Sequence, residues 1–219
     1  ALVERGKIVR EHIAGEDACY LARLHDCECY VARQLLSMDG QALCPPDDLD
    51  LLLQRIQREQ GITYAPLQVE AVRTAAKQQL LLLTGGPGTG KTTSLRGILS
   101  LFDHLGLRTA LTAPTGRAAK RLSEACDAEA STIHRLLETR FDTSTGLLAF
   151  AHNERAPLDI DAVILDEASM VDLVLMQALL AALPNGCRLI LVGDPHQLPS
   201  VGAGNLLSLD ENGNLALDG

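Results

Sequence analysis

The sequence predicts an α/β fold, in which a parallel sheet with crossover helices follows a small, mainly helical module. From residue 62 on, short apolar runs alternate with longer helical stretches. Each apolar run ends in polar or glycine residues, and open α/β sheets place their ligands at such strand ends. Residues 1–61 have helical patterning, more carboxylates than lysines and arginines, and no catalytic signature. We therefore expect a helical module over 1–61, the α/β domain over 62–208 and a tail over 209–219.

The composition is that of a globular protein. The chain has 219 residues, of which 47% are hydrophobic and 21% charged, so it can bury a core. No apolar run approaches the roughly 18 residues of a membrane span, and the first residues carry charges where a signal peptide is apolar. These features predict a soluble, cytoplasmic protein with no membrane partner.

The net charge of −9 argues mildly against a nucleic-acid partner, because phosphate backbones are bound mainly by Lys and Arg. The segment 112–121 differs from the rest, since it holds Arg117, Lys120 and Arg121 and no carboxylate. A basic stripe inside an acidic chain is compatible with a groove that binds a strand.

The six cysteines are expected to be reduced, because the sequence carries no secretory signal. The cluster of His25, Cys27, Cys29 and Cys44 raises the alternative of a zinc site. Cys27 and Cys29 lie two positions apart in a stretch patterned as a helix, so their side chains point to different faces. We therefore favour ordinary buried thiols over zinc.

Start and stop signals place the elements. A helix over 46–60 begins with acidic residues behind two prolines and ends at Gly61. Buried parallel strands are expected at Leu80–Thr84, Thr109–Ala113, 162–167 and 188–194. Helices that begin at Lys91 and Arg117 follow the first two strands and supply crossovers.

The segment 85–92, GGPGTGKT, has the spacing of a phosphate-binding loop, directly after an apolar strand and directly before a helix. Glycines let the backbone curl around phosphate oxygens, and the helix N-terminus adds partial positive charge. Lys91 is placed for the β- and γ-phosphates of ATP, and the Thr92 hydroxyl suits Mg²⁺. This context disfavours a plain glycine-rich turn. The predicted nucleotide contacts are Gly86, Pro87, Gly88, Thr89, Gly90, Lys91, Thr92 and Thr93.

Two carboxylates follow the third expected strand. In AVILDEASMVD, four apolar residues lead to Asp166 and Glu167, which emerge toward the phosphate loop if the two strands are neighbours. Asp166 is then expected to hold Mg²⁺, and Glu167 to orient or deprotonate the attacking water. An Asp-Glu pair alone is usually a solvated strand end, but the phosphate loop upstream makes the catalytic interpretation strong.

The last expected strand runs into GDPHQLPSVGAGN, where Asp194 and Gln197 are expected near the nucleotide. With GGPGTGKT, TAPTGRAAKRL, STIHRLL and VILDEASMVD, in chain order, this segment makes residues 62–207 resemble the first half of the RecD-like superfamily 1 DNA helicases. That group includes the alpha subunit of exonuclease V. The resemblance implies a RecA-like P-loop NTPase domain, ATP and Mg²⁺ as cofactors, single-stranded DNA as partner, and 5′-to-3′ movement in repair or recombination.

The resemblance also assigns residues. Gln68 corresponds to the family's adenine-reading glutamine, with an exposed helical glutamine as the alternative. Gln197 matches the glutamine that senses the γ-phosphate and couples it to the strand. Hydroxyls, backbone N–H groups and arginine suit contacts that hold phosphates without reading sequence, although a lone histidine is more often structural. The implied strand contacts are Thr115, Gly116, Arg117, Thr132 and His134.

Residues 140–157 place a Thr-Gly turn between short segments that carry Phe141 and Phe150, which predicts a β-hairpin. In the family, a hairpin from this half of the motor helps to split the duplex. Hydrophobic packing of the two phenylalanines is the alternative. The module over 1–61 resembles the family's helical or winged-helix region before the motor, though less specifically.

A complete helicase of this kind continues into a second RecA-like domain with an arginine finger, which these residues do not supply. We therefore expect a piece of a longer protein that binds nucleotide but hydrolyses it slowly by itself. Other subunits of a nuclease–helicase complex are a further class of partner. Two alternatives are an AAA-type remodelling ATPase, from which GDPHQLP and PTGRAAK point away, and a nucleotide-binding module without turnover, which the intact catalytic residues disfavour.

Overall fold

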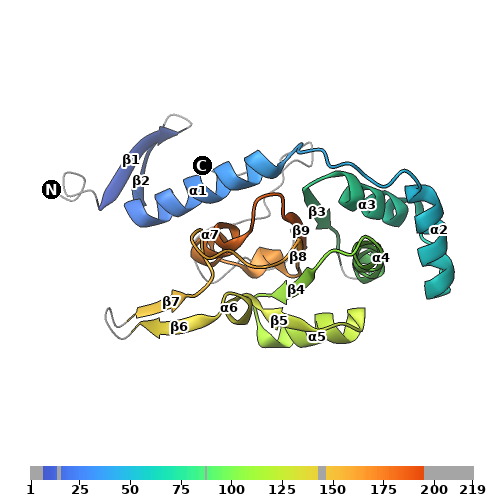
Figure 1. Cartoon of the computed structure of the whole chain (residues 1–219). Helices are drawn as coiled ribbons and strands as arrows, with labels where there is room; N and C mark the ends of the chain where they lie inside the picture. Colours follow the sequence, from blue (N-terminus) through green and yellow to red (C-terminus); the bar gives the residue numbers. More distant parts are fainter. Residues whose placement is uncertain (1–6, 14–15, 87, 143–146, 195–219) are drawn as a thin grey trace.

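A computed structural model of the chain describes residues 7–13, 16–86, 88–142 and 147–194. In these residues a five-stranded sheet has the strand order β3-β9-β8-β4-β5 (Figure 1). Every neighbouring pair in it is parallel. The strands are β3 (Leu80–Thr84), β4 (Thr109–Ala113), β5 (Ala130–Thr132), β8 (Ala162–Leu165) and β9 (Arg188–Gly193). The predicted α/β fold with a parallel sheet is confirmed.

Strand bounds follow the apolar runs closely. β3 and β4 have the expected bounds, whereas β8 ends at Leu165 and β9 at Gly193, short of the expected ends. The residues after each strand leave the sheet, so the polar positions lie beyond its carboxyl edge.

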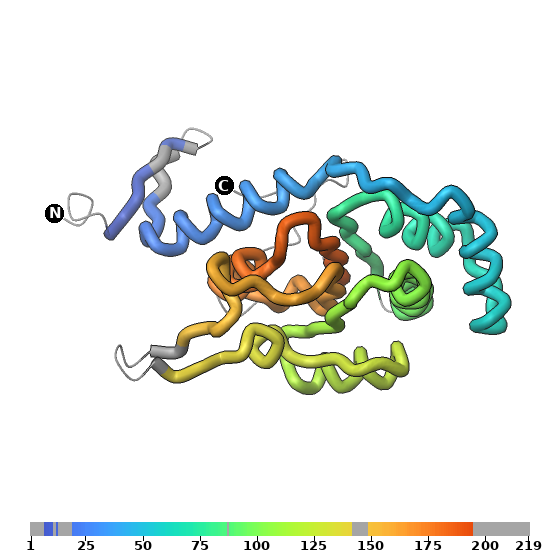
Figure 2. The backbone as a smooth tube through the Cα atoms, in the orientation of Figure 1, coloured from blue at the N-terminus to red at the C-terminus, as the bar shows by residue number. Residues whose placement is uncertain are grey.

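Helices cover both faces of the sheet, and the tube in Figure 2 shows how the chain crosses between them. They are α1 (Ala22–Met38), α2 (Leu49–Gln60), α3 (Pro66–Lys77), α4 (Lys91–His104), α5 (Gly116–Cys126), α6 (Ile133–Leu136) and α7 (Leu173–Ala182). A short 3₁₀ turn, η1 (Ala168–Met170), joins β8 to α7.

Alternate residues of the central strands enter two separate cores. On β8, Val163 and Leu165 belong to the core shared with α1 and α7, whereas Ile164 belongs to the core shared with α2, α3 and α4. On β9, Leu191 and Val192 divide in the same way. Both faces of the strands are therefore buried, which explains why they read as continuous apolar runs.

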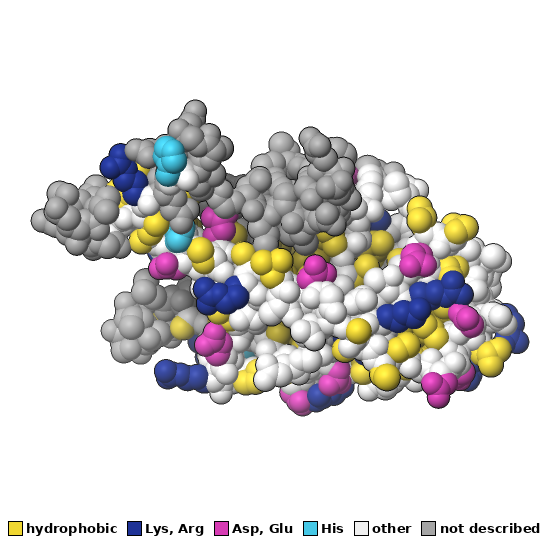
Figure 3. Space-filling view, turned by 90° about the horizontal axis from the view of Figure 1, so that it is seen from above, with side chains coloured by type: hydrophobic (Ala, Val, Ile, Leu, Met, Phe, Trp, Pro, Cys, Tyr) yellow, Lys and Arg dark blue, Asp and Glu magenta, His cyan; other side chains and the backbone are white. Residues whose placement is uncertain are grey.

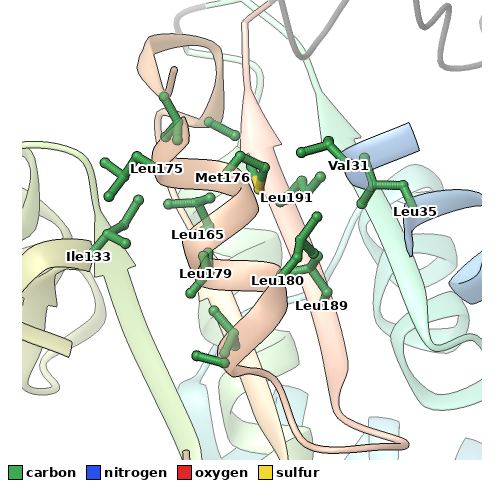
Figure 4. Packing of buried hydrophobic residues seen from close by; sticks show 14 of the residues in the cluster. Val31, Leu35, Ile133, Leu165, Leu175, Met176, Leu179, Leu180, Leu189 and Leu191 are labelled. Atoms are coloured by element: carbon green, nitrogen blue, oxygen red, sulfur yellow. The ribbon is translucent and has the colours of Figure 1, made fainter. Parts of the chain in front are cut away.

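The core around α7 is shown in Figure 4. Met176 and Leu179 are fully buried, and Met176 lies beside Leu191 of β9. Val31 and Leu35 of α1 approach the same strand from the side, so α1 and α7 share one apolar layer.

Residues 1–61 are not wholly helical, contrary to the expectation. β1 (Ile8–Ile13) and β2 (Glu16–Leu21) form an antiparallel hairpin in which Ile13 lies opposite Glu16. The β-branched residues of β1 favour extended backbone, and this preference outweighs the helical patterning nearby. The helix that ends at Gly61 agrees with the expectation, since Gly61 adopts a left-handed φ of 65° that terminates α2.

The helices before residue 61 share cores with the sheet. Cys27 donates its thiol hydrogen to Gln177 on α7, with an Sγ–Oε1 distance of 2.9 Å. Leu53 and Ile56 of α2 are buried in the opposite core, beside α4. Helices α1 and α2 thus belong to the layers that cover the two faces of the sheet. A domain boundary near residue 61 stays a prediction.

Buried thiols were expected in the first module, and the structure agrees only in part. Cys27 is buried, but Cys29 and Cys44 are exposed. Cys29 follows Cys27 by two positions on α1 and therefore faces solvent, where its Sγ lies 3.9 Å from a ring nitrogen of His25. Among the described residues, no group of three or more His, Cys, Asp or Glu side chains is arranged to hold a metal ion.

A second hairpin lies where the sequence predicts one. β6 (Thr139–Asp142) and β7 (Leu147–Phe150) pair antiparallel and extend away from the sheet (Figure 1).

No helix in the described part of the chain is both long and apolar enough to span a membrane. The cytoplasmic location stays a prediction.

Candidate functional site

The phosphate loop joins β3 to α4 and requires glycine at two positions. Gly90 has a φ of 86°, and a Cβ there would lie 2.4 Å from Nε2 of Gln68. A Cβ on Gly85 would lie 2.7 Å from Oγ1 of Thr89. Any larger residue would have to displace these neighbours, so the loop keeps its backbone close to the side chains of Gln68 and Thr89. Pro87 lies outside the described residues.

Lys91 begins α4 and turns its side chain back over the loop. Its Nζ donates to the carbonyl oxygen of Gly86 at 3.0 Å and also to that of Gly85. Thr89 donates its hydroxyl hydrogen to the same Gly86 carbonyl at 2.9 Å. Thr92, in the first turn of α4, is exposed. The ammonium and the first N–H groups of α4 therefore converge on one small region, as binding of a phosphate chain requires.

Gln68 connects α3 to this loop. Its Oε1 accepts from the backbone N–H of Ala65 at 2.9 Å, and its Nε2 lies 3.4 Å from the carbonyl oxygen of Gly90. The side chain is half-buried, so the alternative of a freely exposed helical glutamine does not describe it. Adenine recognition by Gln68 stays a prediction.

The strands that precede the phosphate loop and the Asp166–Glu167 pair are not neighbours in the sheet. β9 lies between β3 and β8, so Asp166 reaches the phosphate loop across the end of β9. Burial raises the pKa of Asp166, while the N–H of Glu167, which donates to its Oδ1 at 2.9 Å, and the charge of Lys91 act in the opposite direction. Asp166 and Lys91 are thus close enough to interact electrostatically.

Asp166 and Thr92 suit a magnesium ion. Both offer the hard oxygen ligands that Mg²⁺ prefers. The raised pKa of Asp166 marks a carboxylate whose negative charge is poorly solvated, and a nearby cation would compensate for that loss of water.

Glu167 adopts an unusual backbone conformation. Its φ of 52° and ψ of 40° are left-handed, which costs a non-glycine residue on the order of 1–2 kcal/mol. Such strain tends to occur at functional positions. The Glu167 carboxylate lies 3.6 Å from the guanidinium of Arg121 on α5. Sequence reasoning missed this contact, because no local pattern joins positions 46 residues apart.

The predicted strand contacts lie on two neighbouring strand ends. In the register of β4 and β5, Ala113 is opposite Thr132, which brings the two motifs together. Thr115 caps α5, with its Oγ1 accepting from the N–H of Ala118 at 3.2 Å. Thr132 accepts from the N–H of Arg135 in the same way and at the same distance. Both oxygens have a structural role, while each hydroxyl hydrogen is still able to donate.

The other predicted contacts surround these threonines. Gly116 and Arg117 are exposed in the first turn of α5. His134 is also exposed, and its ring centroid lies 6.0 Å from that of Phe150 on the hairpin. His134 therefore has a packing partner as well as an open edge.

A groove of about 440 Å³ lies between α5 on one side and β5 with the start of α6 on the other. Arg135 and Lys120 add basic side chains to it, and sequence reasoning had not singled out Arg135. The groove is lined by Gly116, Ala119, Lys120, Ser123, Glu124, Ala130, Ser131, Thr132 and Arg135. The face that carries α1, seen from above in Figure 3, instead mixes acidic and basic side chains.

Gln197, the predicted γ-phosphate sensor, lies outside the described residues. Asp194, which directly follows β9, is buried.

Comparisons with known proteins found a family model and several relatives. A family model described as an AAA domain matches residues 68–203. The ATP-dependent RecD2 DNA helicase of Deinococcus radiodurans is 47% identical over 63% of this chain and 18% of its own length. The RecBCD enzyme subunit RecD of Mycolicibacterium smegmatis is 43% identical over 64% of this chain and 29% of its own. A solved structure of two coordinating Pif1 helicases at forked double-stranded DNA has a TM-score of 0.40 and 22% identity, over 73% of this chain and 35% of the solved one.

The chain spans less than a third of the length of these two curated relatives. The family model, by contrast, covers more than half of the chain and includes the phosphate loop, both carboxylates and the strand motifs. The chain therefore belongs to this AAA domain family, and its resemblance to the RecD-like helicases is confirmed.

Proposed function

We propose that this chain is the ATP-binding lobe of an ATP-dependent DNA helicase that moves 5′ to 3′ along single-stranded DNA in repair or recombination. One observation carries the proposal: the phosphate loop, the Asp166–Glu167 pair and the end of the α5 groove that Gly116 and Thr132 line all follow carboxyl ends of strands in one parallel sheet. The names of the relatives, an ATP-dependent DNA helicase and a subunit of the RecBCD enzyme, support it.

The nucleotide would bind by exchange of hydrogen bonds. Lys91 would give up the carbonyl oxygens of Gly85 and Gly86 for the β- and γ-phosphate oxygens. Gln68 stands beside the loop, where its amide would read adenine. Thr92 and Asp166 would hold Mg²⁺, which neutralises charge on the phosphates. Glu167 would orient the attacking water and accept its proton.

The strand would bind along the groove without base readout. Arg117 and the hydroxyl hydrogens of Thr115 and Thr132 would contact phosphates, and the N-terminus of α5 adds partial positive charge. Gln197 is proposed to couple loss of the γ-phosphate to this strand. Other subunits of a nuclease–helicase complex would be further partners, as the name of the RecD relative suggests.

The family description alone does not separate a helicase from an AAA-type remodelling ATPase, but the names of the relatives favour the helicase. A module that binds nucleotide without turnover is disfavoured, because Lys91 and Asp166 interact electrostatically and Glu167 immediately follows Asp166.

The test measures ATP turnover of the complete gene product with and without single-stranded DNA, and its unwinding of duplexes with either a 5′ or a 3′ overhang. We expect DNA to stimulate turnover, unwinding to require the 5′ overhang, and Lys91→Ala to abolish both activities. A rate of ATP turnover that DNA does not change would contradict the proposed helicase function. Unwinding from the 3′ overhang would contradict the direction alone.

A further inference from the structure

Arg121 on α5 is the charged partner that the structure gives to Glu167. The guanidinium Nη1 and the carboxylate Oε1 are 3.6 Å apart. The Arg121 side chain is 60% exposed and the Glu167 side chain 24% exposed, so the contact lies at the rim of the site. The left-handed backbone of Glu167 fixes the direction in which its side chain leaves the strand end.

The same helix begins at the predicted strand contacts. Thr115 caps α5, and Arg117 lies in its first turn. Arg121 follows Arg117 by four positions, so the two guanidinium groups share one side of the helix. A strand that lies along Arg117 would place its next phosphates within reach of Arg121.

A guanidinium that faces both a carboxylate and a phosphate can exchange one for the other. Arginine binds phosphate oxygens in the same forked geometry that it uses for carboxylates. The present pair is partly exposed and its separation exceeds a good hydrogen bond, so its strength is small and a strand phosphate can compete with it.

We propose that Arg121 is a positioning residue that makes the water-activating role of Glu167 depend on the strand. Without a strand, Arg121 draws the Glu167 carboxylate toward α5. With a strand bound, a phosphate takes over Arg121, and Glu167 is released to hold the attacking water. This inference rests on the proposed helicase function.

The experiment uses the complete gene product in four forms: the unchanged protein, Arg121→Ala, Arg121→Lys and Arg73→Ala. Arg73 is the matched control, because it is a partly exposed arginine whose ion-pair partner is Asp50 on α2 and not Glu167. For each form, kcat and KM for ATP are measured without DNA and with saturating single-stranded DNA. Thermal unfolding verifies that each variant is folded.

For Arg121→Ala we expect kcat without DNA to rise about two- to five-fold, the range that an exposed ion pair supports. We expect KM for ATP and the kcat with DNA to be unchanged, so that the stimulation by DNA falls by the same factor. Arg121→Lys keeps the charge and should restore most of the stimulation. Arg73→Ala should match the unchanged protein.

Three results would overturn the inference. Unchanged kcat values in Arg121→Ala would mean that the pair has no effect on Glu167. A fall of both kcat values by one common factor would assign Arg121 a merely structural role. If DNA fails to stimulate even the unchanged protein, the proposed helicase function fails, and this inference with it. Failure confined to Arg121→Ala leaves the proposed function standing.

Discussion

The Lys91 ammonium donates to the carbonyl oxygen of Gly86 at 3.0 Å, so the phosphate loop holds its own cation in place. A lysine fixed over the loop loses little side-chain freedom when phosphate oxygens replace the carbonyl groups. We therefore expect Lys91 to make a strong charge-assisted contact with a bound nucleotide.

Lys91→Ala should weaken binding of ADP and of a non-hydrolysable ATP analogue by about 10- to 100-fold, since hydrogen bonds to charged groups contribute roughly 1.5–3 kcal/mol. Isothermal titration calorimetry measures the change. Lys77→Ala, at the exposed end of α3, is the control and should bind as the unchanged chain does. Equal nucleotide affinities for Lys91→Ala and Lys77→Ala would contradict the assignment of the nucleotide site to this loop.

Gly90→Ala should destabilise the fold by about 1–3 kcal/mol, because the new Cβ meets Gln68 and the left-handed φ is unfavourable for alanine. Gly86→Ala is a matched variant in the same loop, since no atom lies within 4 Å of its Cβ position. It should change stability by less than about 0.5 kcal/mol. Urea unfolding of both variants compares them, and equal midpoints would contradict the close approach of Gln68 to the loop.

Arg117→Ala should weaken binding of single-stranded DNA for all sequences alike. Each phosphate contact on a single strand contributes about 0.7 to the slope of log K against log salt concentration, so the slope should fall by about that amount. Fluorescence anisotropy at several salt concentrations measures it in the complete gene product. Arg55→Ala on α2, paired with Glu59, is the control. An unaltered slope in Arg117→Ala would place the strand elsewhere.

The β6–β7 hairpin exposes one phenylalanine and half-buries the other. Phe141 is 63% exposed, whereas Phe150 packs against the core beside α7. If the hairpin splits the duplex, Phe141→Ala should slow unwinding of a duplex substrate while DNA-stimulated ATP turnover persists. Phe150→Ala should instead lower the melting temperature. Normal unwinding by a folded Phe141→Ala variant would contradict the duplex-splitting role and favour hydrophobic packing as the role of the phenylalanines.

The sheet and the nucleotide loop could be predicted because local sequence determines them. The apolar run Leu80–Thr84 ends where the glycine-rich loop begins, and the loop needs glycine at position 85, where a Cβ would meet Thr89, and at position 90, where φ is left-handed. The end of α2 could be predicted for the same reason, because it depends on the left-handed conformation of one residue, Gly61.

The remaining features depend on contacts between distant segments. Strand order is not written in any single run, so the insertion of β9 between β3 and β8 could not be foreseen. The pairing of Arg121 with Glu167 depends on that order too. The β1–β2 hairpin had a weak local signal, since Ile8, Val9 and Ile13 are β-branched and Gly15 follows, but the acidic helical patterning around it concealed that signal.

The last prediction concerns turnover by residues 1–219 alone: this chain should bind nucleotide, hydrolyse it slowly and show no response to DNA. The resemblance to superfamily 1 motors implies that a second lobe donates the arginine that stabilises charge on the transferred phosphoryl group. In related enzymes such an arginine contributes a factor of about 10³ to 10⁵ in turnover, or about 4–7 kcal/mol of barrier.

Within the chain, Lys91, Asp166 and Glu167 can still position phosphate and water, so slow background turnover is expected. Steady-state ATP turnover of residues 1–219 is compared with that of the complete gene product, each with and without single-stranded DNA, across a range of protein concentrations. Glu167→Gln in the short chain gives the baseline, because it removes the proposed base but keeps the side chain's size. DNA-stimulated turnover by the short chain at the rate of the complete protein would contradict the prediction. A turnover number per chain that rises with protein concentration would indicate instead that a second copy supplies the arginine.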